Sequence, residues 1–175
     1  TAAARNALLG IRADMYEENF VKQLADWCEN HGILLSGHMD QEERPNPSMA
    51  NGDLMKVFKH QHVPGTDDVF YWGRMNPGYK VVTSSAYNYD KPVIWAETYA
   101  AYQECDIHIA YKAAMDQYAM GINMQTPFPG GLEESMSVEE LKEFNAYIGR
   151  LSYMLQGGRH VSDVAVLYPI ASAQA

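Results

Sequence analysis

Short apolar runs alternate along this sequence with longer segments whose apolar residues recur every three or four positions. The runs have the composition of buried strands and cover residues 33–38, 69–72, 93–97, 122–126 and 161–169. The longer segments predict helices over residues 9–30, 52–62, 76–89, 107–120 and 137–155. Because strands joined through helices run in the same direction, this alternation predicts an α/β protein with a parallel sheet and right-handed crossovers.

Local signals mark the ends of several predicted helices. Gly32 and Gly121 stand where the helices over 9–30 and 107–120 should stop. Ser137 and Glu140 have the spacing of a capping box at the start of the last helix. An apolar stripe runs along the first helix and consists of Ile11, Met15, Phe20, Leu24 and Trp27.

Two architectures fit this order of elements, a doubly wound sheet and a (β/α)8 barrel of the TIM type. Polar and aromatic residues near the ends of several strands favour the barrel, whose active face lies there: His38, Trp72, Glu97 and Gln125. Four barrel strands are half of the usual eight. We therefore expect residues 1–158 to be the C-terminal half of a barrel catalytic domain, and residues 159–175 to hold the first strand of a following domain or the chain terminus.

Charge and composition exclude several classes of protein. A formal charge of −9 and a pI near 5.0 argue against nucleic-acid binding, which needs a basic face. No basic run is present to hold an anionic membrane, and no apolar stretch approaches the roughly 20 residues of a membrane span. Cys28 and Cys105 lack metal-ligand spacing and are predicted to be buried free thiols. His60 and His62 face different sides of a helix without a third ligand nearby, which predicts a solvated helix end and no metal site.

Glu97 is the strongest candidate for a catalytic residue. It ends the apolar run over 93–97, between Trp95 and Tyr99. A carboxylate at a strand end among aromatic rings is partly desolvated, as catalytic carboxyl groups often are. Glycoside hydrolysis uses two such groups, one that protonates the leaving oxygen and one that attacks the sugar or activates water. Alternatively, Glu97 pairs with a core Arg or Lys, or caps the next segment.

The loop after the first predicted strand carries a second group of candidates. His38 is followed by Asp40, Glu42 and Glu43, a set that can supply an acid, a substrate clamp or ligands for a hard cation. We expect His38, nearest the strand end, to face the pocket and bind substrate, with Glu42 or Glu43 as a catalytic carboxylate. The alternative is a solvated acidic loop.

Aromatic and amide side chains near other strand ends would suit a sugar. The rings of Trp72 and Tyr99 can stack on the apolar faces of sugar rings. Asn123 and Gln125 can hydrogen-bond to sugar hydroxyl groups, or equally to backbone within the barrel. All four are therefore candidates for substrate binding.

A series of short stretches covers most of the chain, and their order is more specific than any one of them. The stretches are Tyr16–Phe20, Asp26–Cys28, His31–His38, Gly52–Met55, Val63–Asp67, Ser84–Ala86, Lys91–Pro92, Ile94–Glu97, Gly121–Asn123, Arg150–Leu155 and Gly158–Val166. Together they resemble bacterial α-L-rhamnosidase-type glycoside hydrolases (family 106 and its relatives). Within that resemblance, Ile94–Glu97 matches the strand that carries a catalytic glutamate.

The resemblance implies a secreted or periplasmic multidomain enzyme, with a carbohydrate substrate and further domains of the same parent chain after the barrel. It also implies a calcium ion near the sugar, although no spacing in this sequence specifies its ligands. The second carboxylate is then Glu42, Glu43 or a residue on a strand upstream of Thr1.

We therefore predict a glycoside hydrolase, or a fragment of one that is inactive alone, resembling α-L-rhamnosidases. A non-catalytic carbohydrate-binding barrel is one alternative, and it would keep its sugar affinity in a Glu97→Gln variant without any turnover. A metal-dependent hydrolase or isomerase built on His38 and the acidic loop would lose activity to a chelator. A self-folding α/β interaction domain would unfold cooperatively and bind no sugar.

Overall fold

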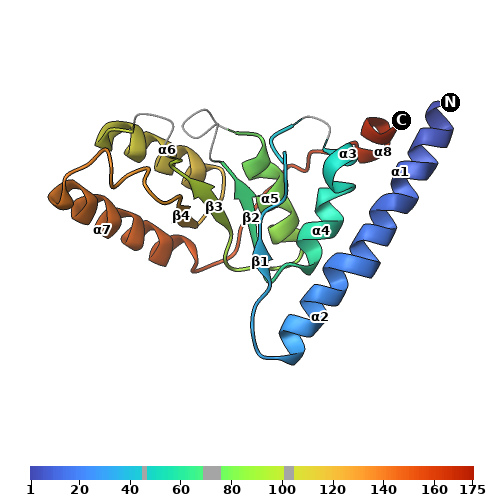
Figure 1. The fold of residues 1–175 in the computed structure, drawn as a ribbon, viewed down its shortest axis with the longest axis horizontal. Coiled ribbons are helices and arrows are strands. Elements are labelled where there is room, and N and C mark those ends of the chain that lie inside the picture. Colours follow the sequence, from blue (N-terminus) through green and yellow to red (C-terminus); the bar gives the residue numbers. More distant parts are fainter. Residues whose placement is uncertain (45–46, 69–75, 101–104) are drawn as a thin grey trace.

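The computed structural model of this protein describes residues 1–44, 47–68, 76–100 and 105–175 (Figure 1). Its strands are β1 Ser36–Gly37, β2 Val63–Asp67, β3 Trp95–Thr98 and β4 Met124–Pro127. Its helices are α1 Ala2–Tyr16, the π-helical η1 Glu17–Val21, α2 Lys22–Asn30, α3 Ser48–Asn51, α4 Leu54–His60, α5 Gly78–Asn88, α6 Ile107–Ala119, α7 Val138–Leu155 and α8 Ile170–Gln174. In this described part, four parallel strands form one sheet in the order β1-β2-β3-β4. The predicted α/β class with a parallel sheet is confirmed.

The helices agree with the sequence more closely than the strands do. Gly32 (φ +68°) and Gly121 (φ +106°) follow α2 and α6 at the predicted stops, and both hydrogen bonds of the Ser137–Glu140 capping box are present. By contrast, β1 has two residues instead of the six expected over 33–38, and the strand expected over 69–72 lies outside the described residues. The strand β2 was missed because Pro64 and Gly65 are residues that strands usually avoid.

Helix α1, η1 and α2 follow one another without a break and form a single rod at one side of the molecule (Figure 1). The buried side of this rod carries mainly small residues, among them Ala13, Ala25 and Cys28. Ala13 lies directly against Gly52, where an added Cβ would sit 3.0 Å from the Ala13 Cα. The residues of the apolar stripe noted in the sequence are instead 43–59% exposed. Small side chains therefore decide which side packs, because they let the rod approach the chain around Gly52.

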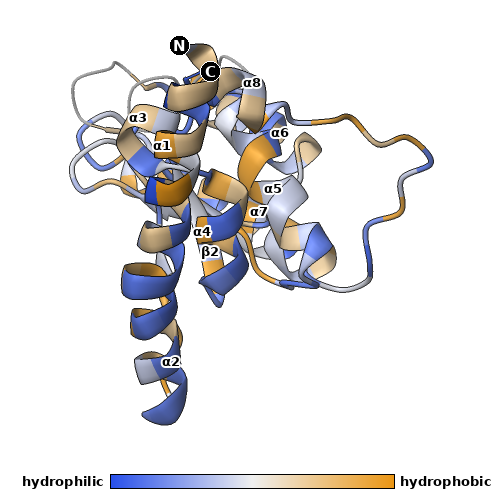
Figure 2. Cartoon of the chain, turned by 90° about the vertical axis from the view of Figure 1, so that its right-hand side faces the viewer, coloured by the Kyte–Doolittle hydropathy of each residue, from blue (hydrophilic) through white to orange (hydrophobic). Residues whose placement is uncertain are grey.

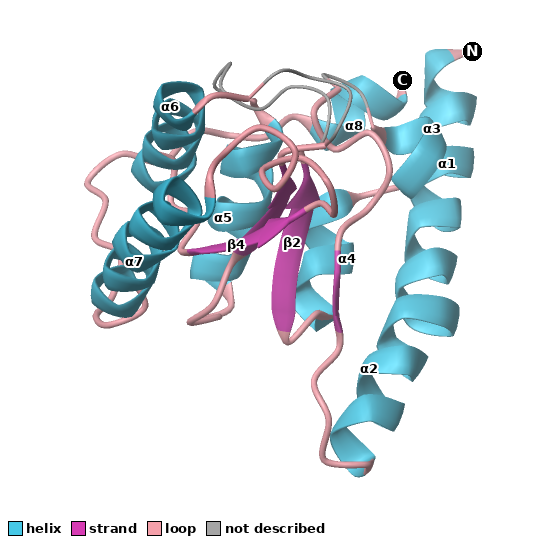
Figure 3. Ribbon diagram, turned by 60° about the vertical axis from the view of Figure 1, so that its left-hand side comes forward, coloured by secondary structure: helices cyan, strands magenta, loops and turns pink. Residues whose placement is uncertain are grey.

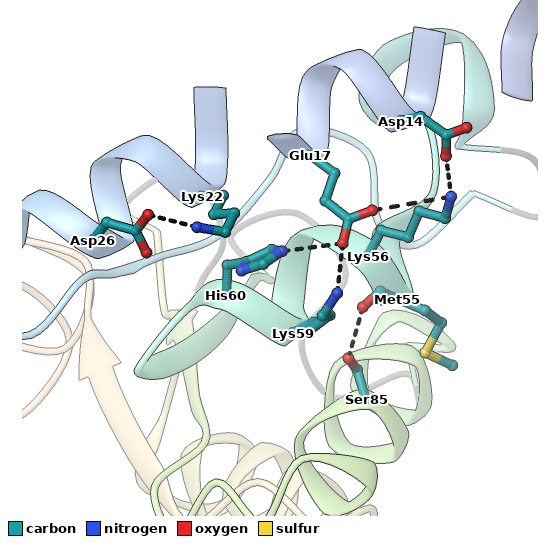
Figure 4. A network of polar contacts seen from close by, with 9 residues as sticks. All are labelled: Asp14, Glu17, Lys22, Asp26, Met55, Lys56, Lys59, His60 and Ser85. Atoms are coloured by element: carbon teal, nitrogen blue, oxygen red, sulfur yellow. Dashed lines mark hydrogen bonds and ion pairs between the residues drawn. The ribbon is translucent and has the colours of Figure 1, made fainter. Parts of the chain in front are cut away.

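Glu17 ties the rod to α4 (Figure 4). Its carboxylate is 92% buried and lies 2.9 Å from the Lys59 Nζ, 3.0 Å from the His60 Nε2 and 3.9 Å from the Lys56 Nζ. Burial alone would raise the pKa of Glu17, but hydrogen bonds from Lys59 and His60 hold it below the usual value. The carboxylate is therefore a buried anion compensated by three neighbouring groups.

Replacing Glu17 by Gln should lower the free energy of unfolding at pH 7 by about 1–2 kcal/mol, because the cationic groups of α4 lose their anion. A carboxyl group with a lowered folded-state pKa stabilises above its unfolded pKa, and that stabilisation disappears as the pH falls through the folded pKa. The difference between wild type and variant should therefore shrink below about pH 4. Urea unfolding at pH 7 and pH 3 measures both values. Glu29→Gln, at an exposed position on α2, is the control, and an equal loss in both variants would contradict the assignment.

Two apolar clusters pack around the sheet. Helices α4 and α5, behind the strands in the view of Figure 3, form the first cluster with residues on or next to β3 and β4: Leu54, Phe58, Tyr79, Val82, Ala86, Ile94, Ala96 and Ile122. Helices α6 and α7 form the second, which includes Tyr99, Ala110, Tyr118, Leu132 and Phe144. Ala96 is fully buried under α4 and α5, so its neighbours Trp95 and Glu97 point to the opposite face of the sheet. We call this opposite face, which carries Gly65, Asp67, Trp95 and Glu97, the far face.

The chain between α7 and α8 is an extended loop that stands away from the rest of the molecule (Figure 2). The strand expected over 161–169 does not form, and Val161, Val164, Val166 and Leu167 are 76–91% exposed. An ion pair of 3.2 Å between Arg159 and Asp90 attaches its start, and α8 then lies beside α1 (Figure 1). Among the described residues, no strand lies beside this run for it to pair with, and an apolar composition without a pairing partner does not make a strand. That residues 159–175 open a further domain stays a prediction.

Two further predictions concern the cysteines and membrane-spanning helices. Cys28 and Cys105 are buried and free, as predicted. Within the described ranges, no helix combines the length and the apolar character needed to cross a membrane.

Candidate active site at the carboxyl edge of the sheet

Three candidate side chains meet where the strands end. His38 follows β1, Asp67 is the last residue of β2, and Glu97 lies near the end of β3. Asp67 and Glu97 are partners in the β2–β3 register and therefore lie side by side on the far face. The carboxyl ends of parallel strands meet at one edge of a sheet, which is why residues distant in sequence converge here.

His38 connects the two predicted acidic positions. Its Nε2 lies 3.2 Å from the Glu97 Oε2, and its Nδ1 lies 4.0 Å from the Glu42 Oε1 and 2.9 Å from the Met39 carbonyl oxygen. The side chains of His38 and Glu97 are 32% and 25% exposed, so solvent reaches both. The prediction that His38 and Glu97 lie close together is confirmed.

The environment of His38 favours its charged form. Burial lowers the pKa of the imidazole, but the hydrogen bond to the Met39 carbonyl raises it. Three carboxylates raise it further, namely Glu42, Asp67 and Glu97, and the resulting pKa lies above the usual value for histidine. An imidazolium therefore faces Glu97 over a wider pH range than an isolated histidine would allow.

Glu42 is buried behind His38. Its Oε1 accepts hydrogen bonds from the Met39 amide at 2.5 Å and the Asp67 amide at 3.4 Å. Its Oε2 is buried and has no hydrogen-bond partner among the described residues. Burial raises the pKa of Glu42 to about 7, against the opposing effect of these amides and of His38. A side chain without exposed surface cannot touch a substrate directly, so Glu42 acts on the site through His38.

Trp95 lies on the far face next to these residues. Its indole covers Gly65 on β2 and donates a hydrogen bond from Nε1 to the Val63 carbonyl oxygen at 3.2 Å. The His38 ring meets it edge-on, with 6.0 Å between ring centroids. An added Cβ at Gly65 would lie 2.2 Å from the indole, so the glycine is required for this ring position.

Replacing Gly65 by Ala should displace the Trp95 ring and destabilise the protein by about 1–3 kcal/mol, the usual cost of overpacking. Urea unfolding followed by tryptophan fluorescence measures the stability and the change in indole environment. Gly37→Ala is the matched control, because an added Cβ there meets nothing closer than 3.7 Å. Equal stability and equal spectra for both variants would show that Trp95 tolerates the extra methyl group.

Three residues predicted to bind substrate lie away from this site, on the helix-covered side. Tyr99 is fully buried in the α6–α7 cluster, and its hydroxyl donates to the Ala110 carbonyl or to the Gln125 Oε1, at 3.2 and 3.1 Å. Gln125 also donates to the Gln117 Oε1 at 2.6 Å. Asn123 accepts from the Ile94 amide and donates to the Pro92 carbonyl. All three therefore hold the fold together in this structure, and we leave them out of the candidate site.

Two further predicted site residues, Glu43 and Trp72, are less fully described by the structure. Glu43 is half-buried, its amide lies near Gly78 at the start of α5, and its charge acts on Asp68. The structure therefore places the Glu43 backbone on the α5 side of the loop. Trp72 lies outside the described residues.

A buried polar network that the sequence did not reveal supports the site from behind. Asp68, the residue after β2, is fully buried and accepts hydrogen bonds from the Asn76 amide, the Tyr79 hydroxyl and the Gln117 amide. Gln117 also donates to the Thr98 hydroxyl at 2.7 Å. Burial raises the pKa of Asp68 to about 7, although the amide hydrogen bonds oppose this. The network joins the ends of β2 and β3 to α5 and α6, and thereby fixes the strand ends that carry Asp67 and Glu97.

The calcium ion that the resemblance implies does not fit the residues around Glu97. In the described ranges, the group whose ligand atoms lie within 4.8 Å of one another is Glu17, Glu18 and His60, on the rod and α4. There, Lys59 and Lys56 already contact both oxygens of the Glu17 carboxylate. At Glu97, the described residues form no set of three ligand atoms within 4.8 Å of one another, and the contacting group is the His38 imidazole, a nitrogen donor where calcium takes oxygen ligands. We therefore derive no chemical step through a metal ion.

A cavity of about 680 Å³ lies elsewhere, near the starts of β3 and β4 and the ends of α5, α6 and α7. Its basic lining residues include Lys91, Arg159 and His160. Arg159 forms an ion pair with Asp90, and the His160 ring stacks on Tyr87, so these two residues have structural partners. The chemistry-bearing groups are instead gathered at the opposite, carboxyl edge.

Comparisons with known proteins do not identify a relative. No family model, curated protein or solved structure matches this chain. The resemblance to α-L-rhamnosidases therefore rests on the residues quoted above and stays a prediction.

Proposed function

We propose that this protein is a glycoside hydrolase in which Glu97 is one of two reacting carboxylates. The observation that carries the proposal is the contact between Glu97 and His38 at the carboxyl edge of the sheet, on its far face. A carboxylate is the kind of group that can attack the anomeric carbon of a sugar or take a proton from water, and Glu97 keeps exposed surface through which a substrate can reach it.

The neighbouring residues then have distinct roles. His38 positions the Glu97 carboxylate and balances its charge, and buried Glu42 holds His38 in its charged form. Trp95 is only 9% exposed, and it packs edge-on against the His38 ring and so helps to hold that ring in place. The substrate class is a carbohydrate, and the resemblance makes α-L-rhamnosides the first sugars to test.

We further propose that the sheet is half of a (β/α)8 barrel. Strand order equals chain order, as in a barrel, whereas doubly wound sheets reverse direction at a switch point. Parallel sheets are normally covered on both faces, yet Glu97 and Thr126 keep exposed surface on the far face. Further strands joined to β1 and β4 would enclose this face, and the second carboxylate would come from one of them.

The proposal is tested by incubating the intact protein with a panel of aryl glycosides that includes an α-L-rhamnoside. We expect catalytic release of the phenol from at least one of them. Sugar binding without turnover would favour a non-catalytic carbohydrate-binding barrel, and turnover abolished by a chelator would favour a metal-dependent enzyme. Either result would overturn the metal-free glycosidase proposed for Glu97.

A further inference from the structure

Asp67 ends the Val63–Asp67 stretch of the resemblance, which assigns it no role, and it has the position of a specificity-determining residue. It is the last residue of β2 and the register partner of Glu97, so the two Cα atoms are about 4.8 Å apart across neighbouring strands. Thr66 and Ala96, which precede Asp67 and Glu97 in the chain, are fully buried on the helix-covered face of the sheet. Because side chains alternate along a strand, Asp67 and Glu97 project from the far face. Asp67 is half-buried, which leaves part of it accessible.

The backbone and charge of Asp67 are tied to the same site. The Glu42 carboxylate accepts a hydrogen bond from the Asp67 amide, which fixes the end of β2 relative to the His38 loop. The Asp67 carboxylate also acts on His38, whose charged form it favours. Glu97, Asp67 and His38 therefore surround one region of the far face, and any substrate that reaches Glu97 there also comes close to Asp67.

We infer that Asp67 recognises the hydroxyl group next to the anomeric carbon of the sugar, so that the substrates are glycosides with a free 2-hydroxyl. This inference rests on the proposed function. An ionised carboxylate is an acceptor with about four lone-pair sites, so it can accept from a sugar hydroxyl in addition to its contacts within the protein. Glu97 acts at the anomeric carbon, and a carboxylate one strand away is at the right spacing for the adjoining hydroxyl. Hydrogen bonds to the 2-hydroxyl strengthen in the transition state of glycoside hydrolysis, which makes this contact affect the rate.

The test is a cycle of two enzymes and two substrates. The intact protein and its Asp67→Asn variant are assayed with an aryl glycoside and with the 2-deoxy form of the same glycoside. We expect Asp67→Asn to lower kcat/KM for the first by about 10–100-fold, the effect of losing a hydrogen bond to a charged acceptor, and for the second by less than about 3-fold. Asp163→Asn, at an exposed aspartate on the loop between α7 and α8, should change neither value.

Each outcome has a distinct meaning. An equal loss for both substrates would overturn the inference, because it would assign Asp67 to the fold or to the charge of His38. An unchanged kcat/KM for both would overturn it as well, by showing that Asp67 does not contact the sugar. In both cases the proposed function would survive, since the wild-type protein still hydrolyses the glycoside. If the wild type hydrolyses neither, the proposed function fails together with this inference.

Discussion

Replacing Glu97 by Gln should lower kcat on a glycoside substrate by about 10³–10⁴-fold, the usual effect of losing a group that transfers a proton or attacks the substrate. Gln has nearly the same shape as Glu and can still contact His38, but it cannot attack the anomeric carbon or take a proton from water. KM should therefore change little. Steady-state kinetics of the intact protein with the best aryl glycoside of the panel measures both constants.

Two controls separate chemistry from folding in this experiment. The Glu97→Gln variant should unfold at the same urea concentration as wild type within error, because Gln fills nearly the same volume and can keep the contact with His38. Glu29→Gln changes an exposed carboxylate on α2, outside the site, and should keep wild-type kcat. If Glu97→Gln and Glu29→Gln hydrolyse the substrate equally well, Glu97 has no part in the reaction.

Replacing His38 by Gln should lower kcat/KM by about 10–100-fold at pH 6, because Glu97 loses a charge-assisted hydrogen bond and its counter-charge. In the wild type the pKa of His38 is raised, so its imidazolium persists to higher pH than in an isolated histidine. Activity should then fall as the pH rises and the coupled His38–Glu42 pair loses its protons. The His38→Gln variant should lack this decrease, which a pH profile of kcat/KM shows directly.

A Glu42→Gln variant tests whether the Glu42 carboxylate helps to keep His38 protonated. The Glu42 charge is one of the causes that raise the pKa of His38, so removing it should let His38 lose its proton at lower pH. The alkaline decrease in activity should shift down by about 1 pH unit, the effect of one nearby opposite charge. An unchanged profile would mean that the imidazolium does not control the reaction.

The sequence predicted the meeting of His38 and Glu97, because both follow apolar runs and parallel strands end at one edge. The sequence also predicted that Tyr99 binds substrate, but this side chain is buried, and the reason is local. Two residues after Glu97 on a regular strand, Tyr99 should share its face, but its φ of +69° breaks the alternation and turns the ring into the α6–α7 core. The residues around Tyr99 do not predict this turn, since left-handed backbone is usual for glycine and rare for a bulky aromatic residue.

Pairing between strands explains most of the other differences. Gln125 faces the helices because it pairs with Ala96, and a one-residue change of register would have turned it to the far face. Asp67 was overlooked for the same reason, since only its pairing with Glu97 places it in the site. Glu42 became a buried group behind His38 through a turn in which Gln41 has a φ of +61°. Register and turn geometry depend on the whole fold, and periodicity within one segment does not contain them.

Chemical rescue of a Glu97→Ala variant tests the central claim most directly. Alanine leaves space where the carboxylate stood, and azide, a small anionic nucleophile, can attack the anomeric carbon from there while the phenolate leaves. We predict that the intact Glu97→Ala protein releases phenol very slowly from an aryl glycoside. Added azide should accelerate the release at least about 10-fold, and the sugar should be recovered as a glycosyl azide. A Glu97→Ala variant that keeps wild-type turnover, or a slow variant that azide neither accelerates nor converts to a glycosyl azide, would contradict a role for Glu97 at the glycosidic bond.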